Sequence, residues 1–450
     1  MTWRRESLVA QPIRLPGPTP TWVLAVERSK RIHPLRLSTE NWSSSAVASH
    51  GLRLFGRVTD WLEEDSSNTV RVMAIAAASG SWLPDHQAHV LYTAAYVDST
   101  IEELGSVLHD YLAKDPLKLV PRFTPTHEDV VLAGIDPLPQ SVPRLFADAL
   151  NQSRNMLEHA LFAEVAHRAG RSLTEKESKA LEIPAAKSPD AFQQWCKHPN
   201  RRSLALFECG AELTTRLERI QPYQRTDNAN HPLRLLVEFT NHAKHREPAV
   251  AFTRVGRVDV GTPSRAPMSA EHQEIVKIGE VLASAPRGSR VEVSIWPQVM
   301  VQRPHSGEWR TLMHEVRHIE DWVRRMALPI LIEGRTDLPV VPPHLDIRQG
   351  YADIAEAWAA AGTVAAADRN TYRMMAEGLR RSIADMLVDE TGEGVRAAAE
   401  EWLRGQSDEE VTALFEPVGR AAARRDLETV GRLTDEWRVA IGLGPQQDDN

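Results

Sequence analysis

The chain is poor in cysteine and in long apolar runs. Its 450 residues include two cysteines, Cys196 and Cys209, which match no spaced zinc or redox motif. So few thiols are typical of proteins from a reducing compartment, and we expect a cytoplasmic location. Apolar runs such as 327–332 are too short to span a bilayer, and the first residues form no apolar signal segment. No membrane association is therefore predicted.

An excess of positive charge is also absent, because the formal net charge is −8. This charge argues against a general nucleic-acid coat, which needs many basic side chains to neutralise phosphates, and it gives no indication of DNA binding. A local basic pocket is still compatible with it. No convincing internal repeat, no GxGxxG between a strand and a helix and no GxSxG elbow occurs, so these patterns give no indication of a repeat protein, a dinucleotide-binding fold or an α/β-hydrolase.

What remains is a globular composition, with 42% hydrophobic and 25% charged residues. Apolar positions recur mainly with a helical period, whereas residues 249–303 alternate with a period of two. We therefore predict a mainly α fold, formally α+β, with a helical bundle core, an inserted small antiparallel β-sheet and a C-terminal helical module. The proline-rich stretch 115–143 is predicted to be a linker or an irregular loop. The predicted domains are a mixed N-terminal region (1–140), the helical core with its β insertion (141–337) and the C-terminal module (338–450).

The most informative stretch is residues 145–170, which we predict to be one long helix. Pro143 precedes it and Gly170 closes it, as is usual at helix ends. Within it lies the first polar knot, residues 154–159, with the sequence RNMLEH. Its apolar stripe consists of Leu145, Leu150, Met156, Leu157, Ala160, Leu161, Val165 and Ala166.

A second polar knot, residues 241–246 with the sequence NHAKHR, ends another apolar helix that starts at His231-Pro232. Asn241 and His245 are four residues apart, so they share one side of the last helical turn. Lys244, His245 and Arg246 can hold a phosphate there. The structural alternative is that cations gather at a helix C-terminus because they suit its partial negative charge.

The first polar knot resembles the motif of HEPN-domain proteins, which are helical bundles common in bacterial toxin and defence systems. The shared features are Arg154, the polar Asn155 directly after it, and His159 after four intervening residues. The second polar knot, with LLVEFTN leading into it and IQPYQR upstream, resembles a widespread set of bacterial proteins that we take as distant relatives of this group. The resemblance covers residues 142–246.

This resemblance implies a metal-independent endoribonuclease that needs no cofactor, acts on RNA and assembles its site across a homodimer. Arg154 would bind the phosphate, His159 would act as general acid or base with Asn155 beside it, and the second knot would bind the substrate through Asn241, Lys244, His245 and Arg246. The chemistry suits these residue types, because imidazole titrates near neutral pH and guanidinium binds phosphate in a bidentate manner.

Helix geometry leaves a structural alternative for the first polar knot. At about 100° per residue, Arg154 and His159 point about 140° apart, whereas Arg154 and Glu158 share one side. The alternative is an ion pair between Arg154 and Glu158, with His159 in a contact between helices.

Residues 314–318 read HEVRH, a literal HExxH. Two imidazoles four residues apart on a helix, His314 and His318, can bind zinc, and Glu315 can act as the base on a metal-bound water. With Glu333 as third ligand, the pattern resembles the gluzincin metallopeptidases.

Three features count against the zinc interpretation. Arg317 places a charge where these enzymes have uncharged residues, Glu320 stands where an apolar residue is usual, and Pro329 interrupts the short stretch before Glu333. The structural alternative is an amphipathic helix that turns Leu312, Val316, Ile319 and Val323 toward the core. The favoured prediction is the HEPN-like ribonuclease of toxin or defence type, with a zinc-dependent metallopeptidase and a non-catalytic helical interaction protein as alternatives.

Overall fold

The computed structural model describes residues 21–23, 81–260, 275–288, 292–387, 393–424 and 426–442. Most of the predicted region 1–140 that precedes residue 81 lies outside these ranges. The described chain is mainly helical and contains two small antiparallel sheets, which confirms the predicted fold class. None of the helices in these ranges is long and apolar enough to cross a membrane.

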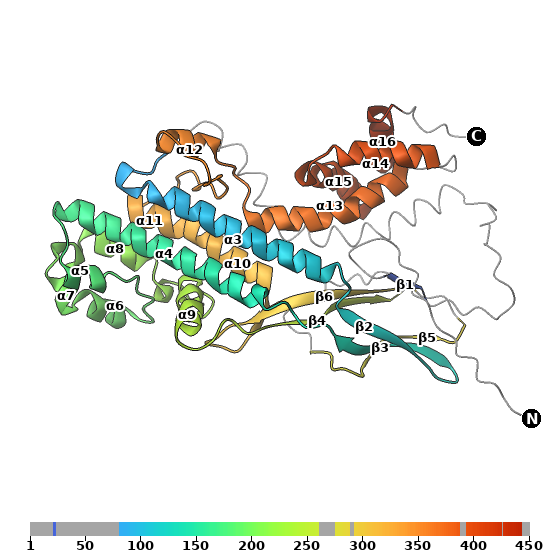
Figure 1. The fold of residues 1–450 in the computed structure, drawn as a ribbon, viewed down its shortest axis with the longest axis horizontal. Helices are drawn as coiled ribbons and strands as arrows, with labels where there is room; N and C mark the ends of the chain where they lie inside the picture. The colour runs from blue at the N-terminus through green and yellow to red at the C-terminus, as the bar shows by residue number, and fades with distance from the viewer. Residues whose placement is uncertain are drawn as a thin grey trace, which may run out of the picture.

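A bundle of long helices forms the centre of the molecule (Figure 1). Helix α3 (His89–Leu112) lies along α4 (Ser141–Ala169), and the helical run α10 (Leu312–Trp322), η4 (Val323–Ala327) and α11 (Leu328–Glu333) packs against α4. Helix α4 is the predicted long helix. It ends at Gly170, whose φ of 62° is readily adopted by glycine.

Shorter helices cover one end of this bundle (Figure 1). Helix α9 packs against α4 and α10, and α8 packs against α11. The bounds of these helices and of three 3₁₀ turns are η1 (Asp85–Gln87), α5 (Glu175–Ala180), α6 (Pro189–Cys196), α7 (Pro199–Arg202), η2 (Ala205–Phe207), α8 (Glu212–Arg219), η3 (Pro222–Gln224) and α9 (Pro232–His245).

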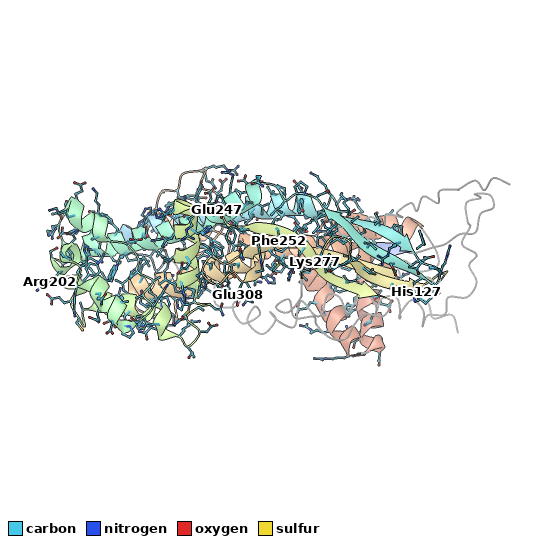
Figure 2. The ribbon with its side chains drawn as sticks, turned by 90° about the horizontal axis from the view of Figure 1, so that it is seen from below. His127, Arg202, Glu247, Phe252, Lys277 and Glu308 are labelled. Atoms are coloured by element: carbon cyan, nitrogen blue, oxygen red, sulfur yellow. The ribbon has the colours of Figure 1, made fainter. Side chains whose placement is uncertain are left out.

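The two sheets lie toward the other end of the long axis. In Figure 2, Arg202 at the end of α7 and His127 at the start of β3 mark opposite ends of the molecule, with Phe252 of β4 between them. Strand β6 pairs with β1, β4 and β7 in one sheet, and β3 lies between β2 and β5 in the other. The bounds are β1 (Thr21–Val23), β2 (Leu117–Phe123), β3 (His127–Ile135), β4 (Ala251–Val260), β5 (Val281–Pro286), β6 (Glu292–Gln302) and β7 (Trp309–Thr311).

The prediction of a linker at 115–143 was wrong, because β2 and β3 occupy most of that stretch. Pro121 has no N–H to donate to a neighbouring strand, yet it pairs with Val130 because β2 is an edge strand of its sheet. The predicted insertion at 249–303 supplies β4, β5 and β6. It therefore contributes to both sheets instead of forming one of its own.

Two apolar clusters divide the helical part of the fold. The larger runs from Leu83 to Ala367 and fills the bundle, while the second runs from Ala376 to Trp437 within the C-terminal helices. The apolar packing thus changes within α13, and the domain boundaries at 140 and 337 stay predictions. The C-terminal helices are α12 (Ile354–Ala360), α13 (Ala366–Leu387), α14 (Glu393–Arg404), α15 (Asp408–Ala423) and α16 (Leu427–Ala440).

Helix α13 docks on α3 mainly through charged groups. Arg369 pairs with Asp98 at 2.8 Å and with Glu102 at 2.9 Å, and buried Asp98 also accepts a hydrogen bond from the backbone N–H of Ala366. Gly105 of α3 allows the close approach, because a Cβ at this position would lie 2.1 Å from the side chain of Asn370.

We predict that Gly105→Ala destabilises the protein by about 1–3 kcal/mol, as overpacking of a filled interface does. Urea unfolding measures this change. Gly378→Ala on α13 is the matched control, since nothing lies within 4 Å of the added methyl group and alanine favours a helix. The double variant Gly105→Ala/Asn370→Ala should recover most of the loss. An unchanged loss in the double variant would contradict the packing explanation.

Candidate functional site

Arg154 joins the two polar knots. Its side chain is 3% exposed, and its Nη1 donates to Oδ1 of Asn241 at 2.7 Å and to Oγ1 of Thr240 at 2.9 Å, both on α9. The remaining donors meet two carboxylates: Nε donates to Glu158 at 2.8 Å, and Nη2 donates to Glu182 in the segment after α5. One guanidinium therefore ties together α4, α9 and residue 182.

This arrangement contains the ion pair of the structural alternative. Burial of a guanidinium is costly unless its charge and its hydrogen bonds are matched, and here Glu158 and Glu182 supply the charge while Thr240 and Asn241 supply neutral acceptors. A phosphate at Arg154 would have to displace a carboxylate and would face the other at short range. In the described chain Arg154 thus positions α9 and is not open to a ligand.

His159 lies on a different side of α4. It is exposed, and its ring centre is 6.3 Å from that of His89 on α3. Asn155 donates to the side chain of Gln152 at 3.3 Å. Within one chain, α4 therefore directs Arg154 toward α9 and His159 toward α3, as five-residue spacing on a helix requires.

The second polar knot is exposed at the end of α9. Asn241, Lys244, His245 and Arg246 all face solvent, and only Asn241 meets Arg154. In the described part of the chain, the side chains of the other three make no hydrogen bond or ion pair. The structure therefore presents three cationic or titratable groups next to the contact that joins the knots, at the C-terminal end of a helix, where cations are favourable.

In the HEVRH sequence the histidines and the glutamate point in different directions. His314 and His318 are exposed on α10, whereas Glu315 is buried and receives two hydrogen bonds from Arg303, from Nε at 2.6 Å and from Nη2 at 2.9 Å. Leu312, Val316, Ile319 and Val323 are fully buried, as the structural alternative expects.

Glu333 does not join these histidines. Helix α10, the π-helix η4 and α11 follow one another without a break, so Glu333 lies fifteen residues beyond His318 along one helical run. At about 1.5 Å per residue that separation is roughly 22 Å, far beyond the span of a zinc site. The expected turn back toward the histidines does not form. Among the described residues, no three histidine, cysteine, aspartate or glutamate side chains are grouped so that they can hold a metal.

No family model, curated protein or solved structure matches this chain. The resemblance to HEPN proteins thus depends on the two polar knots alone. The remaining evidence on function is the geometry of these residues and their neighbours.

Of two residues near the HEVRH helix, one was not singled out from the sequence and the other was noted only as a helix start. Arg303, at the end of β6, contacts Asn230 and pairs with Glu308 at 3.2 Å in addition to Glu315, so it fastens the loop before α9 to α10. His231 begins α9: its Nδ1 accepts from the N–H of Leu233 at 3.1 Å. The His-Pro pair is a helix-start signal, but no spacing rule links Arg303 to Glu315 across a strand and a turn.

The two candidate sites are separate places on the surface. Glu247 directly follows the second polar knot, whereas Glu308 contacts Arg303 beside the HEVRH helix, and Figure 2 shows these two residues apart from one another. An open pocket of about 360 Å³ lies elsewhere, between α8, η3 and the π-helix, with Glu218, Arg219 and Met326 in its wall. None of the predicted site residues lines it.

We predict that Arg154→Ala lowers the free energy of unfolding by about 2–3 kcal/mol, because it removes a buried side chain and the hydrogen bonds that join α4, α9 and Glu182. Chemical denaturation measures the loss. Arg432→Ala on α16 is the control: Arg432 forms an exposed i,i+4 pair with Glu436, so its loss should cost less than about 0.5 kcal/mol. Equal effects of the two substitutions would refute a special role for Arg154.

His231 should make the protein less stable in acid. Its burial, together with Arg225 and His318, lowers the pKa of this imidazole from 6.5 to about 4. The unfolded state therefore binds more protons below pH 6.5, so the stabilisation is complete above pH 6.5 and is lost as the pH falls toward 4, by about 3 kcal/mol in total. His231→Asn keeps an N-cap acceptor without titrating. Urea unfolding at pH 7, 6 and 5 should show a shallower pH dependence for this variant, and parallel curves would contradict the assignment.

Proposed function

We propose that this chain is a non-catalytic helical protein that works by binding a partner. One observation carries the proposal: Arg154 and Glu315, the charged groups at the centre of the two enzymatic interpretations, are both bound by partners within the chain. These contacts are accounted for by stability, because the buried charge of Arg154 or of Glu315 would be strongly unfavourable without a partner.

The contacts of Glu315 illustrate the argument. A general base must present a free carboxylate oxygen to a water molecule. Both oxygens of Glu315 instead accept from Arg303, which is itself 5% exposed, and the imidazoles of His314 and His318 lie on the solvent side of the helix. The zinc-peptidase interpretation stays a prediction that the zinc content of the purified protein can test.

The surface we propose for binding is the second polar knot. Lys244, His245 and Arg246 are exposed at the end of α9 and are not matched by acidic partners in the described residues, although the chain as a whole carries a net charge of −8. An acidic macromolecule is the partner that such a surface suits, and RNA is the one implied by the resemblance. The cytoplasmic location stays a prediction from the low cysteine content.

A second candidate is the HEPN-like endoribonuclease of the toxin or defence type. The observation that favours it is the 2.7 Å contact between Arg154 and Asn241, which brings the two knots together from positions 87 residues apart. Because His159 faces α3, a site containing both knots and this imidazole would need a second chain, in agreement with the homodimer that the resemblance implies. Here Arg154 would be a positioning residue, and Lys244 and Arg246 would bind phosphate.

One set of experiments separates the two candidates. We expect labelled single-stranded RNA to remain intact when incubated with the protein in EDTA, because Arg154 is not free to stabilise a transition state. The nuclease would be favoured over the binding function if the protein cleaved the RNA and if this cleavage disappeared in both His159→Ala and His245→Ala. The control is His198→Ala, which alters an exposed histidine on another part of the surface and should leave such cleavage unchanged.

Binding of the same RNA is measured by fluorescence anisotropy at 50 and 200 mM salt. The double variant Lys244→Ala/Arg246→Ala should weaken binding by roughly tenfold or more and reduce its salt dependence, since each lost phosphate contact lowers the slope by about one. Lys114→Ala, an exposed lysine just after α3, is the control. An unchanged affinity in the double variant would show that the second polar knot is not the RNA-binding surface.

A further inference from the structure

Four histidines meet where the start of α3 lies against the second half of α4. His86 belongs to η1 and His89 is the first residue of α3, while His159 and His167 project from α4. We call this group the histidine seam. It contains none of the buried ion pairs of the candidate sites described above.

Two of these imidazoles are stacked. The rings of His86 and His167 are parallel to within 4°, with centres 4.0 Å apart. Nε2 of His86 lies 2.7 Å from Oε1 of Glu164, a buried carboxylate that also accepts from Gln87 at 2.9 Å and from Arg168 at 3.0 Å. The stack is thus anchored to α4 through Glu164.

The other two imidazoles form a looser pair. The ring centres of His89 and His159 are 6.3 Å apart, with an interplanar angle of 60°. Nε2 of His89 is buried and has no hydrogen-bond partner among the described residues. A proton on this nitrogen would lack an acceptor, and the positive end of α3 would oppose the resulting charge. Burial, followed by the neighbouring His159, lowers the pKa of His89 in agreement with this geometry.

The charges around the seam balance at most one extra proton. Glu164 and the exposed Glu212 of α8 both pair with Arg168, and Glu212 also pairs with Arg216, so these four side chains carry no net charge. Asp85 on η1 is exposed, so solvent screens its charge. One imidazolium at the seam is matched by Glu164, but a second at 4.0 Å in the stack, or one at His89, meets repulsion without compensation.

We propose that the histidine seam is an acid-sensitive latch that holds η1 and the first turn of α3 against α4. With all four imidazoles neutral the latch is closed through the contacts of Glu164 with His86 and Gln87. Acidification adds more positive charges than Glu164 can balance. The start of α3 then separates from α4 while the rest of the bundle stays folded.

Hydrogen–deuterium exchange tests the latch in the full chain. Protection of the peptide covering 84–95, corrected for the intrinsic effect of pH on exchange, should fall at least tenfold between pH 7.5 and 5.5. Protection of residues 141–153, in the first half of α4, should change less than threefold. Equal changes in both peptides, or no change in the first, would overturn the proposal.

The matched variants alter exposed histidines, so that the fold is retained. His159→Asn/His167→Asn removes two of the four imidazoles and should reduce the fall in protection at 84–95 to less than threefold. His127→Asn/His198→Asn removes two exposed histidines from other parts of the surface and should behave as the wild type. A wild-type fall in protection that persists in the first variant would refute the role of the seam.

Imidazole NMR of the wild-type protein provides a test that needs no substitution. We expect His89 to remain neutral as long as residues 84–95 are protected, and to take up its proton together with the loss of protection. Titration of all four histidines while these residues remain protected would overturn the latch.

Discussion

The guanidinium of Arg154 is the constraint on which the arrangement of the helical core depends. It lies buried in the contact between α4 and α9, and its donors reach α4, α9 and Glu182. A buried charge of this kind is tolerated only when every partner is in place, so it penalises any packing in which one of the three segments is displaced. Apolar side chains, whose attraction has no direction, cannot select one relative placement as strictly.

The same requirement explains why members of charged motifs are found in ion pairs within this chain. In the pairs of Glu315 with Arg303 and of Glu320 with Arg324, both side chains are buried, whereas only the arginine is buried in the pairs of Arg154. From the sequence alone, Glu315 can be placed in a catalytic motif and Glu320 on the polar face of a helix. In the folded chain their charges are matched internally, and the exposed members of the same motifs, such as His314, point to solvent.

The mainly helical fold class and the phase of individual helices were the parts of the structure that the sequence could predict. Four apolar positions from Leu312 in α10 to Val323 at the start of η4 are buried as their spacing indicates, and Arg154 pairs with Glu158 one turn away. These are local relations, fixed by 3.6 residues per turn. The partners from distant segments could not be predicted, because Thr240 and Asn241 meet Arg154 only through the path of the chain. Strand β2 was missed because Pro121 is acceptable only on an edge, and edge position is a property of the whole sheet.

The π-helical turn between α10 and α11 makes the fold depend on the number of residues at this point of the chain, in addition to their identity. There the N–H of Leu328 bonds to the carbonyl of Val323, five residues back, so the turn holds one residue more than an α-helical turn. Each residue rotates a helix by about 100°. Shortening this turn by one residue would rotate α11 relative to α10 and carry the fully buried Leu331 away from the core. Substitutions can be absorbed along this helix more easily than a single insertion or deletion, so homologous chains should align here without gaps.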